Sequence, residues 1–509
     1  MEIANLFLKG LQESITPVSL LYISFGVVWG IIGGATPGIS ASIAMALILP
    51  LTYGMNPLQS LPMLAAVYVG AEYGGSIPAI LINTPGTGAA AATTLDGYKL
   101  NEKGLGGKAL LISLYAGGLG GLVSVLLMAA ATIPLARFAL KFGPTQYFWL
   151  ALMGLSVVGT VSGDNPMKGI ISACIGLLLS CVGADSFTGH LRFTFGLDIL
   201  YYGLELVPVM VGLFAMSSTT RGIVTGKMFK GGEAKVRMTY PTLQEIRSVT
   251  PLAIIMGAVG CVIGALPGAG ATIASWVGYT QAKLFCKGAQ ESFGNGDIRG
   301  VAAPESANNG VPAGGLIPLL ALGIPGSNST AILMSGFAMA GVATGPMLFV
   351  NNPQIPYKLM ASMFIAQIIL LLLGYVLMKP FVLITGMNKV NLAVAILALG
   401  IVGAFSTTNT MSSVWMLLLA TVLGYILNVA GFSAPAVVLG FVLGDLVELN
   451  FRRSIQLSRG EMNVFFKGGI NIALIIITVC SLMLPYVQPV LKKYWSRMAS
   501  GRAGKGSSG

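Results

Sequence analysis

Long apolar stretches recur along this chain of 509 residues, and most polar residues fall between them. The stretches long enough to cross a bilayer as helices lie near 17–35, 107–134, 144–162, 167–184, 199–216, 357–378, 390–406, 412–430, 434–449 and 468–487. Shorter apolar stretches, interrupted by glycine and proline, lie between these. The pattern predicts an all-α polytopic membrane protein with about 10–12 transmembrane helices.

Composition supports a membrane location. Hydrophobic residues make up 55% of the chain and charged residues only 9%, and the mean hydropathy is +0.82. The net charge of +12 does not indicate nucleic-acid binding, because the basic residues sit in loops and near the end of the chain rather than in one patch. By the positive-inside rule, the basic segment 217–250 and the tail 488–509 are expected to be cytoplasmic.

Cysteine and histidine usage argues against several kinds of chemistry. The five cysteines show no metal-binding spacing, and His190 is the only histidine. A histidine-based metal site or a catalytic triad within this chain is therefore not expected. We expect no enzyme activity and no cofactor, apart from Na⁺ or H⁺ as a coupling ion.

Two motifs occur twice. The segment that begins Gly34-Ala35-Thr36-Pro37-Gly38 recurs 230 positions later from Gly264, with seven of eleven positions identical. A second segment, from Gly74-Gly75 to Pro85-Gly86, recurs 240 positions later from Gly314 to Gly326. Two membrane halves with broken helices at matching places are typical of secondary transporters.

The duplication predicts a division of the chain. The expected parts are a first membrane repeat (1–216), the cytoplasmic basic linker (217–250), a second repeat with one extra helix (251–487) and the C-terminal tail (488–509). If the linker and the tail are both cytoplasmic, the second half crosses the membrane an even number of times. Without its extra helix it would cross an odd number of times, so the two pseudo-symmetric repeats are expected to have inverted orientations. The broken helices would form re-entrant hairpins within them.

Each repeated motif contains a Pro-Gly pair inside an apolar stretch. Proline lacks the amide donor and glycine tolerates unusual backbone angles, so each pair is expected to break a helix. In lipid, a broken backbone persists only where protein or a water-filled cavity covers it. A helix that begins at a break presents free amides and a positive dipole end, which favours a carboxylate or phosphate ligand. Close helix packing is the structural alternative for any single break.

Acidic residues near the breaks are candidates for a coupling-ion site. Glu305, with Asn308 and Asn309 close by, and Glu72 would lie at membrane depth, where an ionisable group suggests a proton or cation site. The alternatives are a helix-cap or loop role for Glu305 and a buried structural hydrogen bond for Glu72. Asp96 is expected to cap a turn that faces water.

Six motifs together resemble one transporter family. They are GATPG at 34–38, YGGSIPAILINTPG at 73–86, TTLDGY at 93–98, LPGAGATIAS at 266–275, GVAAPE at 300–305 followed by Asn308 and Asn309, and LGIPGS at 322–327. The chain resembles the large membrane subunit of tripartite tricarboxylate transporters, the TctA type. The resemblance implies ion-gradient-driven uptake of citrate or another organic carboxylate across the bacterial inner membrane. It also implies two partners, a small TctB-like membrane subunit and a TctC-like periplasmic solute-binding protein.

Some positions depart from the family pattern. Glu72 stands where a neutral residue is expected, and Thr87-Gly88 follows the first Pro-Gly pair where an acidic residue is frequent. Gly310-Val311-Pro312 interrupts a run that is usually rich in alanine. These departures affect the prediction of which substrate is carried more than the prediction of the class of protein. The chain also lacks a P-loop motif, which agrees with transport that uses no ATP.

The expected site lies between the two pseudo-symmetric breaks. The predicted substrate-binding residues are Asn83, Thr84, Pro85, Gly86, Thr87, Gly323, Pro325, Gly326, Ser327, Asn328 and Thr330. The residues predicted to line the cavity or hold the coupling ion are Pro37, Gly38, Ser40, Pro267, Gly268, Thr272, Glu305, Asn308, Asn309 and Glu72. A multiply charged anion needs a cotransported cation to enter against a negative-inside potential.

Two other functions stay open at this point. A stand-alone symporter for divalent anions and Na⁺ would use similar hairpins but no binding protein. A polytopic membrane enzyme would need a nucleophile with its base, or a metal cluster, and the sequence offers neither in a recognisable pattern.

Overall fold

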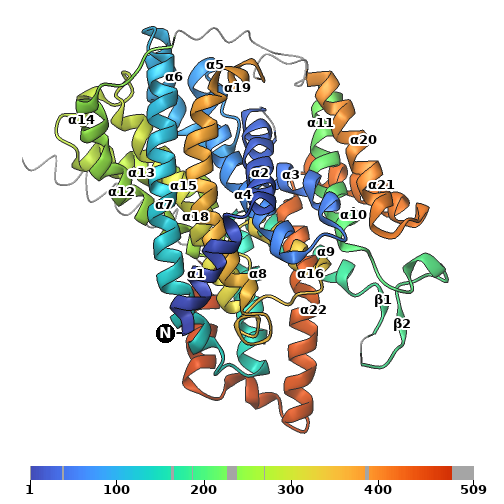
Figure 1. The fold of residues 1–509 in the computed structure, drawn as a ribbon. Helices are drawn as coiled ribbons and strands as arrows, with labels where there is room; N and C mark the ends of the chain where they lie inside the picture. The colour runs from blue at the N-terminus through green and yellow to red at the C-terminus, as the bar shows by residue number, and fades with distance from the viewer. Residues whose placement is uncertain are drawn as a thin grey trace, which may run out of the picture.

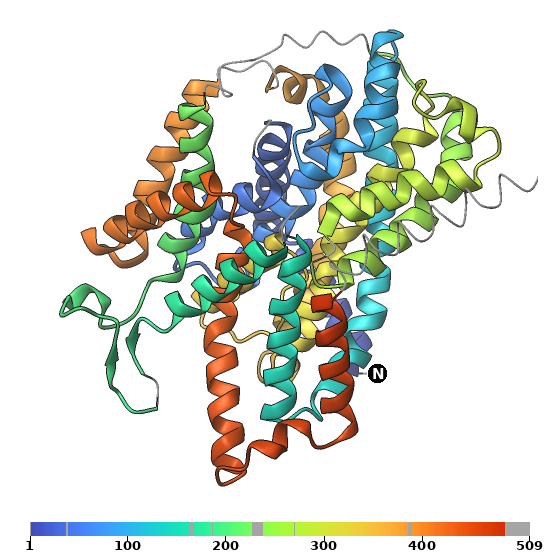
Figure 2. The ribbon, with the colours of Figure 1, turned by 180° about the vertical axis from the view of Figure 1, so that it is seen from behind.

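The computed structural model describes residues 2–36, 39–161, 166–185, 187–225, 238–268, 270–384 and 389–483. Helices dominate these residues, and Figures 1 and 2 show them gathered into one bundle. The elements of the first half are α1 (Glu2–Ser14), α2 (Pro17–Ala35), α3 (Ala41–Ile48), η1 (Leu49–Thr52), α4 (Pro57–Gly74), α5 (Ser76–Ile82), η2 (Gly88–Ala91), α6 (Thr93–Glu102), α7 (Gly106–Ala139), α8 (Pro144–Val161), α9 (Pro166–Ser180), β1 (Gly183–Ala184), β2 (Leu191–Arg192), η3 (Asp198–Leu200), α10 (Leu206–Val211), the π-helical η4 (Gly212–Met216) and α11 (Ser217–Val224).

The second half continues the helical pattern. Its elements are α12 (Leu243–Ala265), α13 (Gly270–Phe285), α14 (Ala289–Ser292), α15 (Arg299–Leu322), α16 (Asn328–Met339), α17 (Leu348–Asn351), α18 (Gln354–Val376), α19 (Met378–Ile384), α20 (Lys389–Thr408), α21 (Met411–Val429), α22 (Ala434–Leu457), η6 (Met462–Phe466) and a last helix, Gly469–Met483. The predicted apolar stretches and these helices coincide closely.

Eight helical segments within the described residues are long and apolar enough to cross a membrane. They are Pro17–Ala35, Pro57–Ile82, Gly106–Ala139, Leu206–Val224, Leu243–Ala265, Gln354–Val376, Met411–Val429 and Ala434–Leu457. Four shorter apolar helices accompany them. The prediction of an all-α polytopic membrane protein is confirmed. The inverted orientation of the repeats stays a prediction.

The first copies of the two motifs together build a close helix crossing. α2 packs along α4, and three glycines allow their backbones to touch. A Cβ added at Gly86 would lie 2.0 Å from the carbonyl oxygen of Gly34 and 2.9 Å from the Cα of Gly75. Because no side chain fits in this space, glycine is required at Gly86.

The second copies of the two motifs build an equivalent crossing. α12 packs along α15, and a Cβ added at Gly326 would lie 2.9 Å from the carbonyl oxygen of Gly264 and 3.1 Å from the Cα of Gly315. These glycines stand 230 or 240 positions after their counterparts in the first crossing. The duplicated sequence therefore produces a duplicated backbone contact.

Long helices hold the two crossings together. α7 packs along α15, and α18 packs along α4 and α7. A second group of helices, α8 with α9 and α22, and α10 and α11 with α21, lies beside this centre (Figure 1). Large apolar side chains on the outer faces, such as Leu21, Leu372 and Leu419, are exposed in the chain alone, as expected for surfaces that contact lipid.

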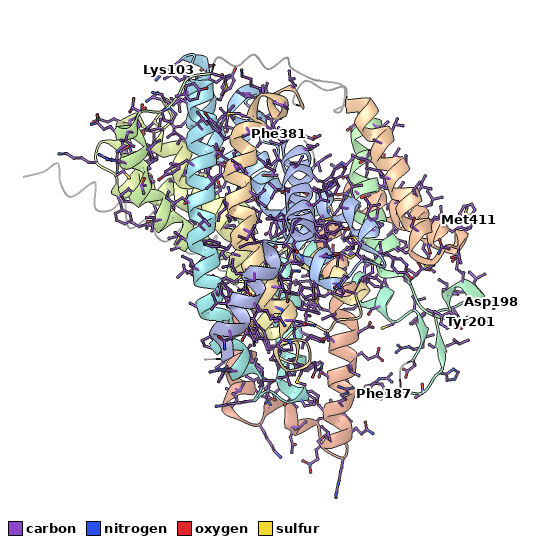
Figure 3. The ribbon with its side chains drawn as sticks, viewed as in Figure 1. Lys103, Phe187, Asp198, Tyr201, Phe381 and Met411 are labelled. Carbon is purple, nitrogen blue, oxygen red and sulfur yellow. The ribbon has the colours of Figure 1, made fainter. Side chains whose placement is uncertain are left out.

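A small hairpin projects from the helices between α9 and α10. Its strands β1 and β2 pair antiparallel, with Gly183 opposite Arg192. Figure 3 shows Asp198 and Tyr201 on this projecting segment, away from Lys103 at the far end of the bundle. The hairpin is the one sheet among the described residues.

Ion pairs hold the hairpin on α22. Arg192 pairs with Glu448 at 2.7 Å and with Asp185 at 3.3 Å, and Arg452 pairs with Asp185 at 2.8 Å. The backbone N–H of Thr188 and the guanidinium of Arg452 hold the pKa of the Asp185 carboxyl well below its usual value. Asp185 therefore stays charged at neutral pH.

The segment predicted as a linker is partly helical. α11 extends into it as far as Val224, and α12 begins within it at Leu243. Thr242 and Glu245 form a capping box at the start of α12, which fixes that helix end. The tail 488–509 lies outside the described residues.

Candidate functional site

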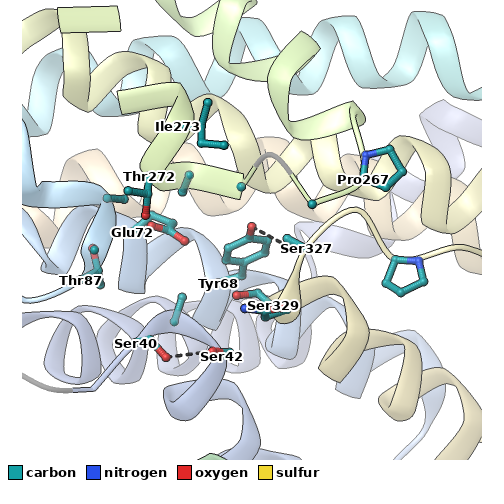
Figure 4. A pocket seen from close by; sticks show the side chains of 18 of the residues that line it. Ser40, Ser42, Tyr68, Glu72, Thr87, Pro267, Thr272, Ile273, Ser327 and Ser329 are labelled. Carbon is teal, nitrogen blue, oxygen red and sulfur yellow. Dashed lines mark hydrogen bonds between the residues drawn. The ribbon is translucent and has the colours of Figure 1, made fainter. Parts of the chain in front are cut away.

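The helices that follow the four breaks all begin at the wall of one cavity of about 400 Å³. These elements are α3, η2, α13 and α16, and each contributes its first residues (Figure 4). The lining residues are Ser40, Ala41, Ser42, Tyr68, Glu72, Thr87, Gly88, Ala89, Gly154, Pro267, Gly268, Gly270, Ala271, Thr272, Ile273, Pro325, Ser327, Asn328, Ser329 and Leu439. Gly154 of α8 and Leu439 of α22 reach this cavity from the second group of helices.

Two of the four breaks, at Pro85-Gly86 and Pro325-Gly326, share the same local geometry. α5 ends at Asn83 and α15 ends at Gly323, both in the left-handed region, with φ of 52° and 76°. The next residue in each case donates its backbone N–H to a proline carbonyl: Thr84 to Pro78 at 3.3 Å, and Ile324 to Pro318 at 3.3 Å. Each helix therefore ends in a tight turn that sends the chain back toward the cavity.

Backbone hydrogen bonds fasten the turns to the crossings. The N–H of Gly86 donates to the carbonyl of Gly75 at 3.1 Å, and the N–H of Gly268 donates to the carbonyl of Gly326 at 3.0 Å. These bonds satisfy backbone groups that have no helical partner at the break. They also place the residues after each Pro-Gly pair at the cavity wall.

Serine hydroxyls start two of the helices. The N–H of Ile43 donates to Ser40 Oγ at 3.3 Å at the start of α3. At the start of α16, Ser327 and Thr330 form a capping box, with the N–H of Ser327 donating to Thr330 Oγ1 at 2.7 Å. Residues Ser40 and Ser327 therefore fix the helix ends and still face the cavity.

The favourable contribution of this cavity to anion binding comes from helix ends rather than from basic side chains. Its described lining holds no lysine, arginine or histidine. The first turns of α3, α13 and α16 carry no acidic residue that would offset the helix dipoles. Free N–H groups and the positive ends of several helices therefore converge on one space, which suits an anion.

Side chains from the two halves of the chain meet across the cavity. The hydroxyl of Tyr68, on α4, and Ser327 Oγ lie 3.1 Å apart in a hydrogen bond, drawn in Figure 4. A Cβ added at Gly88 would lie 3.1 Å from Thr272 Oγ1. Residues of the first half therefore face residues of the second half across the cavity.

Four of the eleven predicted substrate-binding residues line the cavity: Thr87, Pro325, Ser327 and Asn328. The other seven lie elsewhere. Gly86, Gly323 and Gly326 are buried in the turns and crossings, Pro85 is half-buried, and Thr330 is buried under the cap of Ser327. Asn83 and Thr84 are exposed at the tip of the first break.

Five of the residues predicted for the cavity or coupling ion also line it: Ser40, Glu72, Pro267, Gly268 and Thr272. Pro37 and Gly38 lie outside the described residues. Glu305, Asn308 and Asn309 are fully buried on α15 and are absent from the lining. The predicted set thus divides into a cavity group and a group packed behind it.

The buried group on α15 has its own hydrogen bonds. The hydroxyl of Thr93 donates to Glu305 Oε1. The side-chain amide of Asn309 donates to the carbonyl of Glu305 at 2.9 Å, and that of Asn308 donates to the carbonyl of Glu72 at 3.1 Å. Asn308 therefore links the buried group to the helix that lines the cavity.

Asp96 does not face water as predicted. Its side chain is fully buried and accepts hydrogen bonds from the N–H groups of Gly294, Gly296 and Asp297 at 2.8–3.0 Å and from the hydroxyl of Tyr279 at 2.9 Å. The residue instead joins α6 of the first half to the loop that precedes α15. The prediction failed because these partners lie about 200 positions away along the chain.

Of the polar lining residues, sequence reasoning missed Tyr68, and it left Ser42 and Ser329 out of the predicted site although both follow a break. Ser42 and Ser329 are each two residues after a helix-starting serine, so the helix N-termini could have indicated them. Tyr68 lies one turn before Glu72 on the same face of α4, and only that spacing could have indicated it.

Comparisons with known proteins agree with this architecture. The sequence pattern of the family described as "Tripartite tricarboxylate transporter TctA family" matches residues 20–439. The chain belongs to the TctA family. It is therefore the large membrane subunit of a tricarboxylate transporter, and not an enzyme.

Two relatives come from Agrobacterium vitis. A protein described as "Uncharacterized 52.8 kDa protein in TAR-I ttuC' 3'region" is 35% identical over 491 residues, which cover 96% of this TctA-family chain and 97% of the relative. A second, described as "Uncharacterized protein in TAR-II ttuC' 3'region", is 34% identical over 232 residues, which cover 45% of this chain and 96% of that relative. No solved structure matches the chain.

Proposed function

We propose that this chain is the translocation subunit of a tripartite, cation-driven uptake system for a tricarboxylate or related organic anion. The carboxylate binds in the cavity between the broken helices, where the N-terminal ends of α3, α13 and α16 hold it. Ser40, Thr272, Ser327 and Asn328 offer hydroxyl and amide groups at these ends. Binding by helix ends needs no basic side chain in the membrane.

One observation supports the proposal most strongly. All four elements that follow the Pro-Gly breaks start at the same cavity, although they are separated by up to about 290 residues in the sequence. Packing alone does not require these starts to converge. A shared anion site does, because each additional helix end adds favourable interaction with the same negative charge.

The proposal includes partners and an energy source. A periplasmic solute-binding protein delivers the carboxylate, and a small TctB-like membrane subunit completes the complex in the bacterial inner membrane. The cotransported cation is Na⁺ or H⁺, since a multiply charged anion alone would move against the membrane potential. The support for these partners is membership in a family of tripartite transporters.

Uptake into vesicles tests the proposal. The complex is assembled with and without the binding protein and the small subunit, and a panel of radiolabelled carboxylates, citrate first, is offered under imposed Na⁺ or pH gradients. We expect uptake of at least one carboxylate that depends on the gradient and on the binding protein. Uptake without the binding protein would favour the stand-alone symporter, and no uptake of any anion in the panel by the full complex would contradict the proposal.

A further inference from the structure

One charged side chain lines the cavity within the described residues, and it is acidic. Glu72 lies on α4, one turn after Tyr68, and its side chain is 5% exposed. Its Oε2 atom is buried and has no hydrogen-bond partner. In Figure 4 its carboxyl group points into the space between Thr272 and Tyr68.

A carboxylate in this place opposes the binding of an anion. Two like charges in a small space of low dielectric repel each other strongly. A buried carboxylate without a partner is also costly in itself, unless a cation or proton neutralises it. The helix ends explain why an anion binds in this cavity, but they do not explain why the carboxylate of Glu72 lines it.

No neighbouring cation within the described residues compensates Glu72. Of the helices packed against α4, α15 contributes Glu305, which is acidic and acts electrostatically on Glu72. Lys358 of α18 lies against α1, where Glu13 acts on it, and Lys108 of α7 pairs with Glu245 at 2.7 Å.

Two arginines on these helices do not compensate Glu72 either: Arg299, at the start of α15, pairs with Asp297 at 2.6 Å, and Arg137, in the last turn of α7, is exposed. The other titratable groups around α4 are phenols. They include Tyr68 and Tyr73 on α4 itself, Tyr22 on α2 and Tyr115 on α7, and Tyr68 and Tyr115 are hydrogen-bonded to Ser327 and Thr250. The positive charge that neutralises Glu72 must therefore come from solution.

The duplication shows that Glu72 is an addition to the repeated backbone. Gly75 corresponds to Gly315, so Glu72 corresponds to Pro312 in the second half. The second crossing is built without a carboxylate at this position. Glu72 is thus not needed to form the crossing, which argues against a purely structural role.

We propose that Glu72 is the coupling residue of the transporter: its carboxylate takes up one proton when the substrate enters the cavity and releases it on the cytoplasmic side. The O–H bond forms on Glu72 with a proton from the outer solution and breaks when that proton leaves toward the inside. A proton needs only this one carboxyl group, whereas a metal ion needs a shell of several oxygens. The inference rests on the proposed function.

The experiment uses the full complex in proteoliposomes, with radiolabelled citrate or whichever carboxylate of the panel the wild type takes up. An internal pH dye counts protons per carboxylate, and labelled Na⁺ is counted in parallel. The variants are Glu72→Gln, Glu72→Asp and, as a matched control, Glu102→Gln, which removes an exposed carboxylate on α6. Exchange of labelled for unlabelled carboxylate shows that a variant is assembled and still binds.

We expect Glu72→Gln to lose stimulation by an inward pH gradient and to carry about one proton fewer per carboxylate, while exchange stays measurable. Glu72→Asp restores the pH-driven component, and Glu102→Gln matches the wild type. Three results would overturn the inference: an unchanged proton ratio in Glu72→Gln, a loss of Na⁺ rather than H⁺ from the ratio, or loss of exchange in both Glu72 variants. If the wild type transports no carboxylate, the proposed function fails instead.

Discussion

Two of the four breaks, the first at Pro85-Gly86 and the second at Pro325-Gly326, have the same backbone geometry but different chemistry. Both helices end at a left-handed residue, and both turns lie against a glycine crossing. After the second break, Ser327 caps α16, a helix of 12 residues. After the first break, Thr87 precedes η2, a 3-10 turn of four residues, and Thr87 Oγ1 has no hydrogen-bond partner within the described residues.

This difference shows how two copies of one structural element can take different roles in the same site. The second break supplies a full helix end and a capping hydroxyl for an anion. The first break supplies an unpartnered hydroxyl and, through α4, the carboxylate of Glu72. One half therefore contributes mainly to holding the substrate, and the other carries the group suited to a cation. Four predictions test this division.

The largest effect is expected at the crossings. A Cβ added at Gly86 would lie 2.0 Å from the carbonyl oxygen of Gly34. A Cβ added at Gly326 would lie 2.9 Å from the carbonyl oxygen of Gly264. Gly86→Ala should destabilise the protein by about 3 kcal/mol and Gly326→Ala by about 1 kcal/mol. Thermal unfolding of the purified variants measures both. Equal losses would show that the two crossings are equally tight.

The next effect concerns substrate affinity. Ser327→Ala removes the cap of α16 and a hydroxyl that faces the anion, so KM should rise by about 10–100-fold. Thr87→Ala removes a hydroxyl but no cap, and its KM should rise by about tenfold or less. Initial rates of carboxylate uptake give both values. A larger effect at Thr87 would reverse the assignment of roles.

A smaller effect is expected at the left-handed helix ends. Gly323 has a φ of 76°, so Gly323→Ala should cost about 1 kcal/mol of stability because its Cβ would crowd the backbone. Asn83→Ala should cost less, since asparagine already has a side chain there at a φ of 52°. Thermal unfolding compares the two. A greater loss at Asn83 would mean that its side chain makes a stabilising contact.

The smallest effect is expected for transport by Asn83→Ala. Asn83 is exposed at the tip of the break and does not line the cavity. KM for the carboxylate should match the wild type in the same uptake assay. A KM raised as much as in Ser327→Ala would place the substrate at the tip instead.

The sequence predicted the helices and the breaks well, because both depend on local chemistry. Apolar length sets the spans, and Pro-Gly pairs break them. Thr87 and Ser327, which follow corresponding breaks in the two repeats, both line the cavity.

The placement of single polar residues was harder to predict, since it depends on contacts between distant segments. Glu305, like Glu72, is an acidic residue that precedes a break in its repeat, but it is hydrogen-bonded to Thr93 and buried behind the cavity. Asp96 has a sequence typical of a turn, but the loop at Gly294–Asp297 buries it. Asn83 is part of the repeated motif, but it ends α5 and does not line the cavity. No local pattern distinguishes these roles.

Substrate protection of a thiol in the cavity tests the central claim most directly. Cysteine is introduced at Asn328, which lines the cavity and is half-buried, or at Asn83, which lies outside it, in a chain whose native cysteines are replaced by serine. We predict that the transported carboxylate slows modification of the thiol in Asn328→Cys and leaves that in Asn83→Cys unaffected. Protection at Asn83 alone, or at neither position, would contradict a carboxylate site formed by the four broken helices.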